Sequence, residues 1–228
     1  MNKKTSLIAG STGFLGSKIL NYLHKGDQKI YCLSRRKSEI NSINIEDIIV
    51  DFDTINNLSL PKIDHVYLSL GYELRAWELI VMPDKLKYPF YKVDYEYTLN
   101  IAKKSLDAGA KSISLVSAVG ANIDSTSFYL KTKGELEEEI KKLPFETINI
   151  FQPGHLAGRI NWQRKKNDPK LDVFAFEIAS LFIDPLMING LRKFRSIKAE
   201  ELAKFIVKKT NEDTKGTFIF NYNDIIIK

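Results

Sequence analysis

The sequence predicts an α/β fold, a doubly wound and mostly parallel β-sheet with helices on both faces. Short apolar runs of strand length alternate with segments of helical apolar spacing, as expected for a parallel sheet that is covered on both faces. A glycine-rich turn follows the first of these runs. With 228 residues, 44% of them hydrophobic, the chain can bury one sizeable core, so we expect a single domain over residues 1–228.

In the first half of the chain, each expected strand is a short apolar run and each expected helix has apolar residues at helical spacing. The expected strands are 4–9, 29–33, 48–50 and 65–70. One helix follows Gly16, and a second spans 93–108 and ends before Gly109, a residue type that is common directly after helices. The predicted order in this half is strand, helix, strand, strand, strand, helix.

The second half continues the alternation. The expected strands are 112–116, 146–151 and 217–222, and the expected helices are 129–143 and 199–210. Pro144 ends the first of these helices, because proline has no amide hydrogen to donate and its ring clashes with the preceding turn. The complete order predicts a Rossmann-like domain, in which ligands bind at the carboxyl edge of the sheet.

Two stretches, 72–91 and 160–196, interrupt the alternation. The first is rich in proline and tyrosine and contains Trp77, and the second contains Trp162 and a run of apolar and aromatic residues. Both follow the carboxyl ends of expected strands, so we expect them to form the wall of a small-molecule substrate site. Ordinary packing, or a contact between two copies of the chain in a homodimer, is the alternative interpretation.

The net charge of +6 and the pI near 9.1 are compatible with a nucleic-acid partner. However, most lysines alternate with glutamates on helical stretches, which is typical of a solvated face. Local basic clusters occur at 34–37 and 163–166, and a ligand with a phosphate group explains the first of them equally well. We therefore expect no nucleic-acid partner.

Cysteine, histidine and apolar patterning narrow the class of protein further. Cys32 is the one cysteine, which fits a reducing compartment, and the three histidines lack ligand spacing, so we expect no metal site. Apolar runs stay far below the length of a membrane span, and the one at the start of the chain is too short for a secretory signal. These features predict a cytoplasmic protein without a membrane span.

A glycine-rich loop lies between the first expected strand and the first expected helix. Glycines at every third position permit a tight turn and close backbone approach, and the N-terminus of the helix offers free amides and a positive dipole end to a pyrophosphate. We expect the whole loop to bind the phosphates of a dinucleotide. Its residues are Gly10, Ser11, Thr12, Gly13, Phe14, Leu15 and Gly16.

The residues after the second strand indicate which dinucleotide binds. An acidic residue there would accept hydrogen bonds from a ribose 2′-hydroxyl, whereas a basic residue would neutralise a 2′-phosphate. The chain has Ser34, Arg35 and Arg36 and no acid, so we expect NADP (NADPH) rather than NAD.

Two further pairs of residues follow the third and fourth strands. We expect Asp51 and Phe52 to flank the adenine ring. We expect Leu70 and Gly71 to let the backbone approach the ribose and the nicotinamide.

Ser117, Tyr129 and Lys133 form a candidate catalytic set. A tyrosine and a lysine four residues apart share one face of a helix, so the ammonium can lower the pKa of the phenol from its usual value of about 10. Ser117 follows the fifth strand, whose carboxyl end would open onto the same site. An exposed helix face with one aromatic anchor is the alternative interpretation, because Tyr-x-x-x-Lys arises by chance in a lysine-rich chain.

With the glycine loop followed in order by Ser117, Tyr129 and Lys133, the chain resembles the short-chain dehydrogenase/reductase superfamily. Within the superfamily it is most similar to the atypical group that includes the Tat-interacting-protein-like oxidoreductases. The segments that carry this resemblance are Val93-Asp94, 115–121, 128–135 and 152–159.

The resemblance implies hydride transfer between NADPH and a small or moderately apolar carbonyl or alcohol. Tyr129 would be the general acid, Lys133 would lower its pKa and hold the ribose, and Ser117 would orient the carbonyl. The stretch after the sixth strand would close over the nicotinamide. It consists of Pro153, Gly154, His155 and Leu156.

The chain departs from the superfamily pattern at Asp94, where many members have an asparagine in a proton relay. Two other functions stay open. One is a non-catalytic NADP-binding protein that regulates a partner or senses redox state. The other is a sugar-nucleotide epimerase or dehydratase, which the short stretch after Gly158 disfavours because it leaves little room for a nucleotide sugar.

Overall fold

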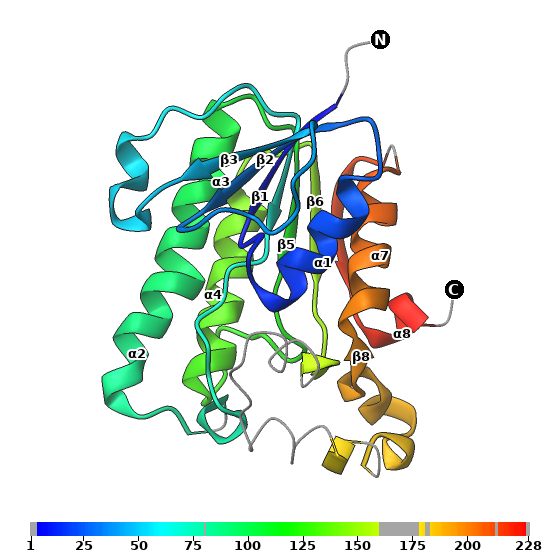
Figure 1. The fold of residues 1–228 in the computed structure, drawn as a ribbon. Coiled ribbons are helices and arrows are strands. Elements are labelled where there is room, and N and C mark those ends of the chain that lie inside the picture. Colours follow the sequence, from blue (N-terminus) through cyan, green and yellow to red (C-terminus); the bar gives the residue numbers. More distant parts are fainter. Residues whose placement is uncertain (1–3, 80, 160–177, 181–182, 213, 227–228) are drawn as a thin grey trace.

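A parallel β-sheet forms the centre of the computed structural model, which describes residues 4–79, 81–159, 178–180, 183–212 and 214–226 (Figure 1). The strands are β1 (Thr5–Ala9), β2 (Lys29–Ser34), β3 (Ile45–Ile49), β4 (His65–Leu68), β5 (Ser112–Val116), β6 (Thr147–Phe151) and β9 (Gly216–Phe220). They lie in the order β3-β2-β1-β4-β5-β6-β9, and each neighbouring pair is parallel. This arrangement confirms the predicted fold class.

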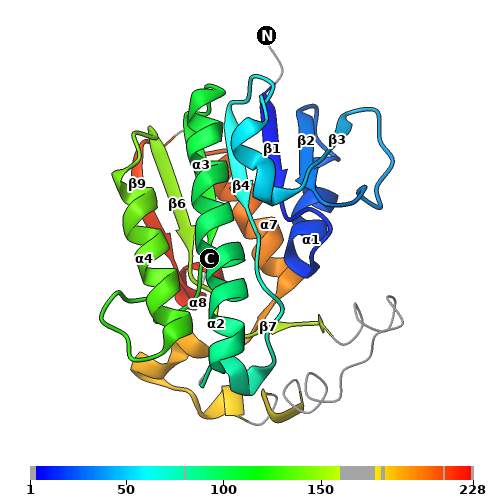
Figure 2. The ribbon, with the colours of Figure 1, turned by 90° about the vertical axis from the view of Figure 1, so that its left-hand side faces the viewer.

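Helices cover both faces of the sheet, as Figures 1 and 2 show. One face carries α2 (Asp84–Tyr91), α3 (Thr98–Asp107) and α4 (Phe128–Lys142), and the other carries α1 (Phe14–Leu23) and α7 (Ala199–Thr210). A short helix α8 (Tyr222–Ile226) follows β9. Among the described residues, no helix is both long and apolar enough to span a membrane.

The alternation of side chains along the strands divides the core into two layers. In β1, Leu7 and Ala9 enter the core beneath α3 and α4, whereas Ile8 between them enters the core beneath α1 and α7. All three are fully buried. Burying a side chain of the size of leucine or isoleucine contributes about 1.5–3 kcal/mol, so both helix layers are held on the sheet mainly by apolar contact.

The chain reverses its direction across the sheet between β1 and β4. It runs outward from β1 through β2 to β3 and then returns to place β4 beside β1, which creates a topological switch point. The loops after these two strands touch, since the amide and the hydroxyl of Ser69 both donate to the carbonyl oxygen of Ala9 at 3.0 Å. Two loops that leave the sheet in different directions therefore meet at its carboxyl edge.

Glycine is required at two positions of this switch point. Gly10 has a positive φ of 90°, and a Cβ there would lie 2.7 Å from the carbonyl oxygen of Ser69. A Cβ on Gly16, in the first turn of α1, would lie 2.0 Å from the carbonyl oxygen of Gly10. The glycines thus allow α1 to begin directly against the end of β1.

The stretch 72–91 is more regular than expected. It contains a 3₁₀ turn η2 (Ala76–Leu79) and the helix α2, which continues through the π-helical segment η3 (Lys92–Tyr97) into α3. The sequence concealed α2 because Pro89 lies inside it and because Phe90 is its one buried residue, so it has almost no apolar periodicity. The expectation of an irregular stretch is therefore wrong for its second half.

Of the stretch 160–196, residues 160–177 and 181–182 lie outside the described part of the chain. The described remainder includes two 3₁₀ turns, η4 (Asp184–Leu186) and η5 (Asn189–Phe194). A two-stranded parallel pair, β7 (Leu156–Ala157) with β8 (Ile197–Lys198), joins the stretch after β6 to the start of α7. Its role in forming a substrate wall stays a prediction.

We expect Gly16→Ala to lower the free energy of unfolding by about 3 kcal/mol, because the new methyl group meets backbone that can move only if α1 shifts. Urea denaturation measures the change. Gly190→Ala is the matched control, since nothing lies within 4 Å of its would-be Cβ, and it should change stability by less than about 0.5 kcal/mol. Equal effects of the two substitutions would contradict this account of the loop.

Candidate functional site

The glycine loop and the residues after β2 lie next to each other at the switch point. The amide of Gly13 donates to the carbonyl oxygen of Gly10 at 3.0 Å and closes the turn, and Gly13 is the N-cap residue of α1, where no side chain caps the helix. The first amides of α1 are therefore not satisfied by a capping side chain. The guanidinium of Arg36 reaches the loop and donates to the carbonyl oxygen of Thr12 at 3.5 Å, and the hydroxyl of Ser34 donates to the carbonyl of Arg36.

These features fit a dinucleotide phosphate. A helix N-terminus without a side-chain cap attracts an anion, and the exposed side chains of Arg35 and Arg36 supply cations beside it. Ser11, within the loop, is buried. The neighbouring Cys32 thiol is buried as well, and burial raises its pKa to about 12, so this thiol stays protonated at neutral pH.

The residues expected near the adenine and the nicotinamide lie at the ends of β3 and β4. Asp51 is exposed and accepts from the amide of Asp53 at 3.0 Å, which begins the 3₁₀ turn η1 (Phe52–Asn57). Phe52 is buried in the core. Leu70 is half-buried and Gly71 is exposed. Contact of these four residues with a cofactor stays a prediction.

A buried ion pair lies at the centre of the candidate site. The ammonium of Lys133 on α4 is 2.7 Å from Oδ1 of Asp94, and their side chains are only 7% and 3% exposed. Oδ2 of Asp94 accepts from the amide of Tyr72 at 2.6 Å. Asp94 belongs to the π-helical segment η3, where the wider turn adds a residue to the helix, a local irregularity that is frequent at functional sites.

Burial and this ion pair together set the direction in which the pKa of Tyr129 is shifted. The phenol is half-buried, and its ring centroid lies 5.5 Å from that of Phe90. Burial raises the pKa of Tyr129, Lys133 lowers it and Asp94 raises it, with a net rise. Lys133 thus acts on the phenol in the expected direction, but Asp94 offsets part of its effect and burial outweighs what remains, so the pKa is raised overall.

Lys133 keeps its charge in this environment. Burial lowers the pKa of its ammonium, but Asp94, Tyr129 and Glu137 together raise it by more, and the net pKa is raised. The sequence does not reveal this pair, although an acidic residue at the position where related chains have asparagine was a signal for it.

Ser117 forms a second buried polar group, which sequence reasoning missed. Its hydroxyl donates to Oε1 of Glu137 on α4, and its amide donates to the carbonyl of Phe151 at 2.8 Å. The side-chain amide nitrogen Nε2 of Gln152, which follows β6, lies 3.0 Å from both carboxylate oxygens of Glu137. The hydroxyl hydrogen that was expected to orient a substrate carbonyl is thus donated to Glu137, and that role of Ser117 stays a prediction.

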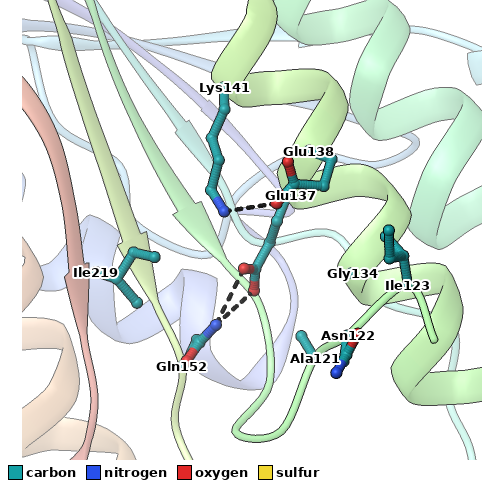
Figure 3. A pocket seen from close by; sticks show the side chains of 9 residues that line it. All are labelled: Ala121, Asn122, Ile123, Gly134, Glu137, Glu138, Lys141, Gln152 and Ile219. Carbon is teal, nitrogen blue, oxygen red and sulfur yellow. Dashed lines mark hydrogen bonds and ion pairs between the residues drawn. The ribbon is translucent and has the colours of Figure 1, made fainter. Parts of the chain in front are cut away.

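A cavity of about 210 Å³ lies against this group, between α4, the turn 121–123 and β9 (Figure 3). A Cβ on Gly134 would lie 2.5 Å from the backbone of Asn122, so this glycine lets the turn approach the helix. The lining residues are Ala121, Asn122, Ile123, Gly134, Glu137, Glu138, Lys141, Gln152 and Ile219.

The stretch expected to close over the nicotinamide is fixed at both ends. Pro153 is buried, and its carbonyl accepts from the amide of Val119 at 2.9 Å. The carbonyl of His155 accepts from the amide of Ile197 at 2.8 Å, and Gly154 passes so close to Phe194 that a Cβ would lie 2.6 Å from its carbonyl oxygen. Leu156 begins β7. Contact of these residues with a nicotinamide also stays a prediction.

Several known proteins are similar to this chain. The model of the NAD dependent epimerase/dehydratase family matches residues 6–158. The protein FMP52 of Lodderomyces elongisporus is 32% identical over 226 residues, which cover 93% of this chain and 89% of that protein. The protein FMP52 of Meyerozyma guilliermondii is 31% identical over 218 residues, covering 93% and 88%.

Solved structures share the fold at low identity. A short chain dehydrogenase family protein from Francisella tularensis has a TM-score of 0.71 at 13% identity and covers 98% of this chain and 99% of its own. MoeE5 in complex with UDP-glucose and NAD has a TM-score of 0.66 at 13% identity, with 98% of this chain and 80% of its own covered.

The expectation of a cytoplasmic location is wrong. The FMP52 relatives are named as mitochondrial proteins. The expectation depended on the lack of disulfides and of a secretory signal, and neither feature distinguishes the cytosol from other reducing compartments.

The family model matches more than half of the chain, and an NAD(P)-binding Rossmann-like fold carries the matched residues. The resemblance to the superfamily is therefore confirmed, and this protein belongs to the NAD-dependent epimerase/dehydratase family of the short-chain dehydrogenases/reductases.

Proposed function

We propose that this protein is an NADP-dependent oxidoreductase that reduces a small or moderately apolar carbonyl compound. The observation that carries the proposal is the position of Tyr129 and the buried Lys133 on the inner face of α4, a helix that packs on the face of a sheet with a dinucleotide-type glycine loop. The FMP52 relatives support a mitochondrial location for this activity.

The preference for NADP rests on Arg35 and Arg36. Both are exposed directly after β2, and Arg36 already reaches the glycine loop through Thr12. No acidic residue is present at 34–37 to accept hydrogen bonds from a free 2′-hydroxyl. Guanidinium groups form paired, charge-assisted hydrogen bonds with phosphate, so this pair favours the phosphorylated ribose.

In the proposed reaction, each of these residues would have a separate role. The loop 10–16 and the N-terminus of α1 would hold the pyrophosphate, and Lys133 would hold the ribose beside the nicotinamide. Bound NADPH would supply a hydride to the carbonyl carbon. Tyr129 would give its proton to the carbonyl oxygen as negative charge develops there. Burial of the site would exclude water from this exchange.

A second function has one specific observation in its favour. The hydroxyl of Ser117 donates to Glu137, and the ammonium of Lys133 is paired with Asp94. The two groups that would assist Tyr129 in catalysis therefore both interact with other residues. A protein that binds NADP and signals to a partner without turnover would tolerate these interactions. The experiments on the cofactor and on Tyr129 distinguish the two functions.

We expect the double substitution Arg35→Ala, Arg36→Ala to weaken NADPH binding by about tenfold to a hundredfold, the loss of charge-assisted hydrogen bonds to one phosphate. NADH binding should change by less than about threefold, because NADH lacks that phosphate. Fluorescence titration measures both constants. Lys111→Ala, which removes a cation before β5 at the opposite edge of the sheet, is the control. Equal weakening of both cofactors would argue against NADP preference.

We expect Tyr129→Phe to reduce NADPH turnover at least about a hundredfold on a carbonyl compound identified by screening, because the proton donor is lost. NADPH affinity should stay within about threefold. Binding of NADPH without oxidation across a broad carbonyl panel by the unmodified protein would instead favour the regulatory function. Full turnover by the phenylalanine variant would exclude Tyr129 as the acid.

We expect Asp94→Asn to lower the pKa of Tyr129, because the negative charge that raises it is removed while Lys133 stays close. Phenolate absorbance, measured against the same titration in a Tyr129→Phe background, reports the change. Asp84→Asn, which alters an exposed pair with Lys87, is the matched control and should have no effect. An unchanged midpoint in Asp94→Asn would show that the ion pair does not control the phenol.

A further inference from the structure

Glu137 is a buried carboxyl group that the proposed reaction does not use. Its residue is 3% exposed and lies on the inner face of α4, two turns beyond Tyr129. Its partners there are the hydroxyl of Ser117, which donates to Oε1, and the amide of Gln152 at 3.0 Å from both oxygens. Both partners are neutral, so a buried carboxylate is held without a directly bound cation.

The charged groups around Glu137 have partners of their own. On the same helix, the ammonium of Lys133 is bound to Asp94 at 2.7 Å, and that of Lys141 is bound to Glu138 at 2.8 Å. Figure 3 shows the Glu137 side chain pointing toward Gln152 within the cavity. Within the described part of the chain, the other elements around the cavity contribute uncharged side chains, namely Ala121, Asn122, Ile123, Gln152 and Ile219.

The hydrogen bond between Ser117 and Glu137 fixes what the serine can do. A serine hydroxyl has one hydrogen to donate, and an ionised carboxylate can only accept. While Glu137 is ionised, the hydrogen of Ser117 is committed to it and cannot be donated to a carbonyl oxygen. When Glu137 is protonated, its own O–H can donate to Ser117, and the serine hydrogen is released.

We propose that Glu137 is a positioning residue that acts through Ser117: its protonated form frees the serine hydroxyl to donate to the substrate oxygen, and its ionised form withdraws that hydrogen. The inference deepens the proposed function and rests on it. The cavity beside Glu137 provides the space through which its carboxyl group exchanges a proton with solvent.

Burial favours the protonated form of Glu137. It raises the pKa of Glu137, while the hydrogen bonds from Ser117 and Gln152 lower it by less. The protonated form is therefore favoured in the folded chain up to a higher pH than for an exposed glutamate. Reduction of the carbonyl should be fastest below that pKa and should decline as the pH rises through it.

The pH dependence of kcat/KM for NADPH-dependent carbonyl reduction tests the proposal. In the unmodified protein we expect a decline of about tenfold per pH unit above the titration of Glu137. Glu137→Gln offers an amide donor to Ser117 at every pH, so this decline should disappear while the rate at low pH stays within about threefold. Glu139→Gln, whose carboxylate pairs with Lys142 on the outer face, is the matched control and should keep the decline.

Two results of that experiment would overturn the proposal. One is an unchanged decline in Glu137→Gln. The other is loss of activity in Glu137→Gln at every pH to the level of Ser117→Ala.

A second measurement needs no substrate and separates this proposal from the proposed function. The ¹³C carboxyl resonance that disappears in Glu137→Gln is assigned to Glu137. The midpoint of its pH titration should move to higher pH in Ser117→Ala, because the hydrogen bond from Ser117 lowers the pKa of Glu137. NADPH binding within about threefold shows that each variant is folded. An unmoved midpoint overturns the proposal, whereas a moved midpoint in a protein without any turnover supports the coupling and refutes only the reductase.

Discussion

The ion pair between Lys133 and Asp94 is the interaction on which the site depends. It joins α4 to the π-helical segment η3 at 2.7 Å, and the second oxygen of Asp94 holds the amide of Tyr72 in the loop after β4. Three segments far apart in the sequence therefore meet at one carboxylate. Because leaving one member of a buried pair without its partner costs about 3–5 kcal/mol, the pair resists any shift of α4 relative to the switch point.

The same pair bears on the direction of the proposed reaction. With the charge of Lys133 offset by Asp94, burial keeps the phenol protonated at neutral pH. A protonated phenol can donate to a developing alkoxide, whereas oxidation of an alcohol would require it to accept a proton first. In the proposed reaction, a protonated Tyr129 would therefore suit carbonyl reduction better than alcohol oxidation.

The periodicity of apolar residues was sufficient to predict the fold, but it predicted only part of the candidate site. Apolar runs and helical spacing identified the seven strands of the large sheet and most helices, because burial on two faces imposes such runs on the central strands. The ion pair could not be predicted in this way, since Asp94 and Lys133 are 39 residues apart and meet only after α3 and α4 pack together. Glu137 was concealed for another reason: it lies in a Glu-rich run that has the composition of an exposed helix face.

The inner face of α4 carries a polar stripe at four-residue intervals, formed by Tyr129, Lys133 and Glu137. At a buried position such groups cost free energy unless each finds a partner, and the partners come from different elements of the fold. Lys133 is paired with Asp94, a group of opposite charge, so its charge is compensated within the protein. Glu137 has neutral partners and a cavity beside it, so its charge remains the variable one. In this stripe the charge of Lys133 is thus paired with an opposite charge, whereas the carboxyl group of Glu137 is held by neutral groups.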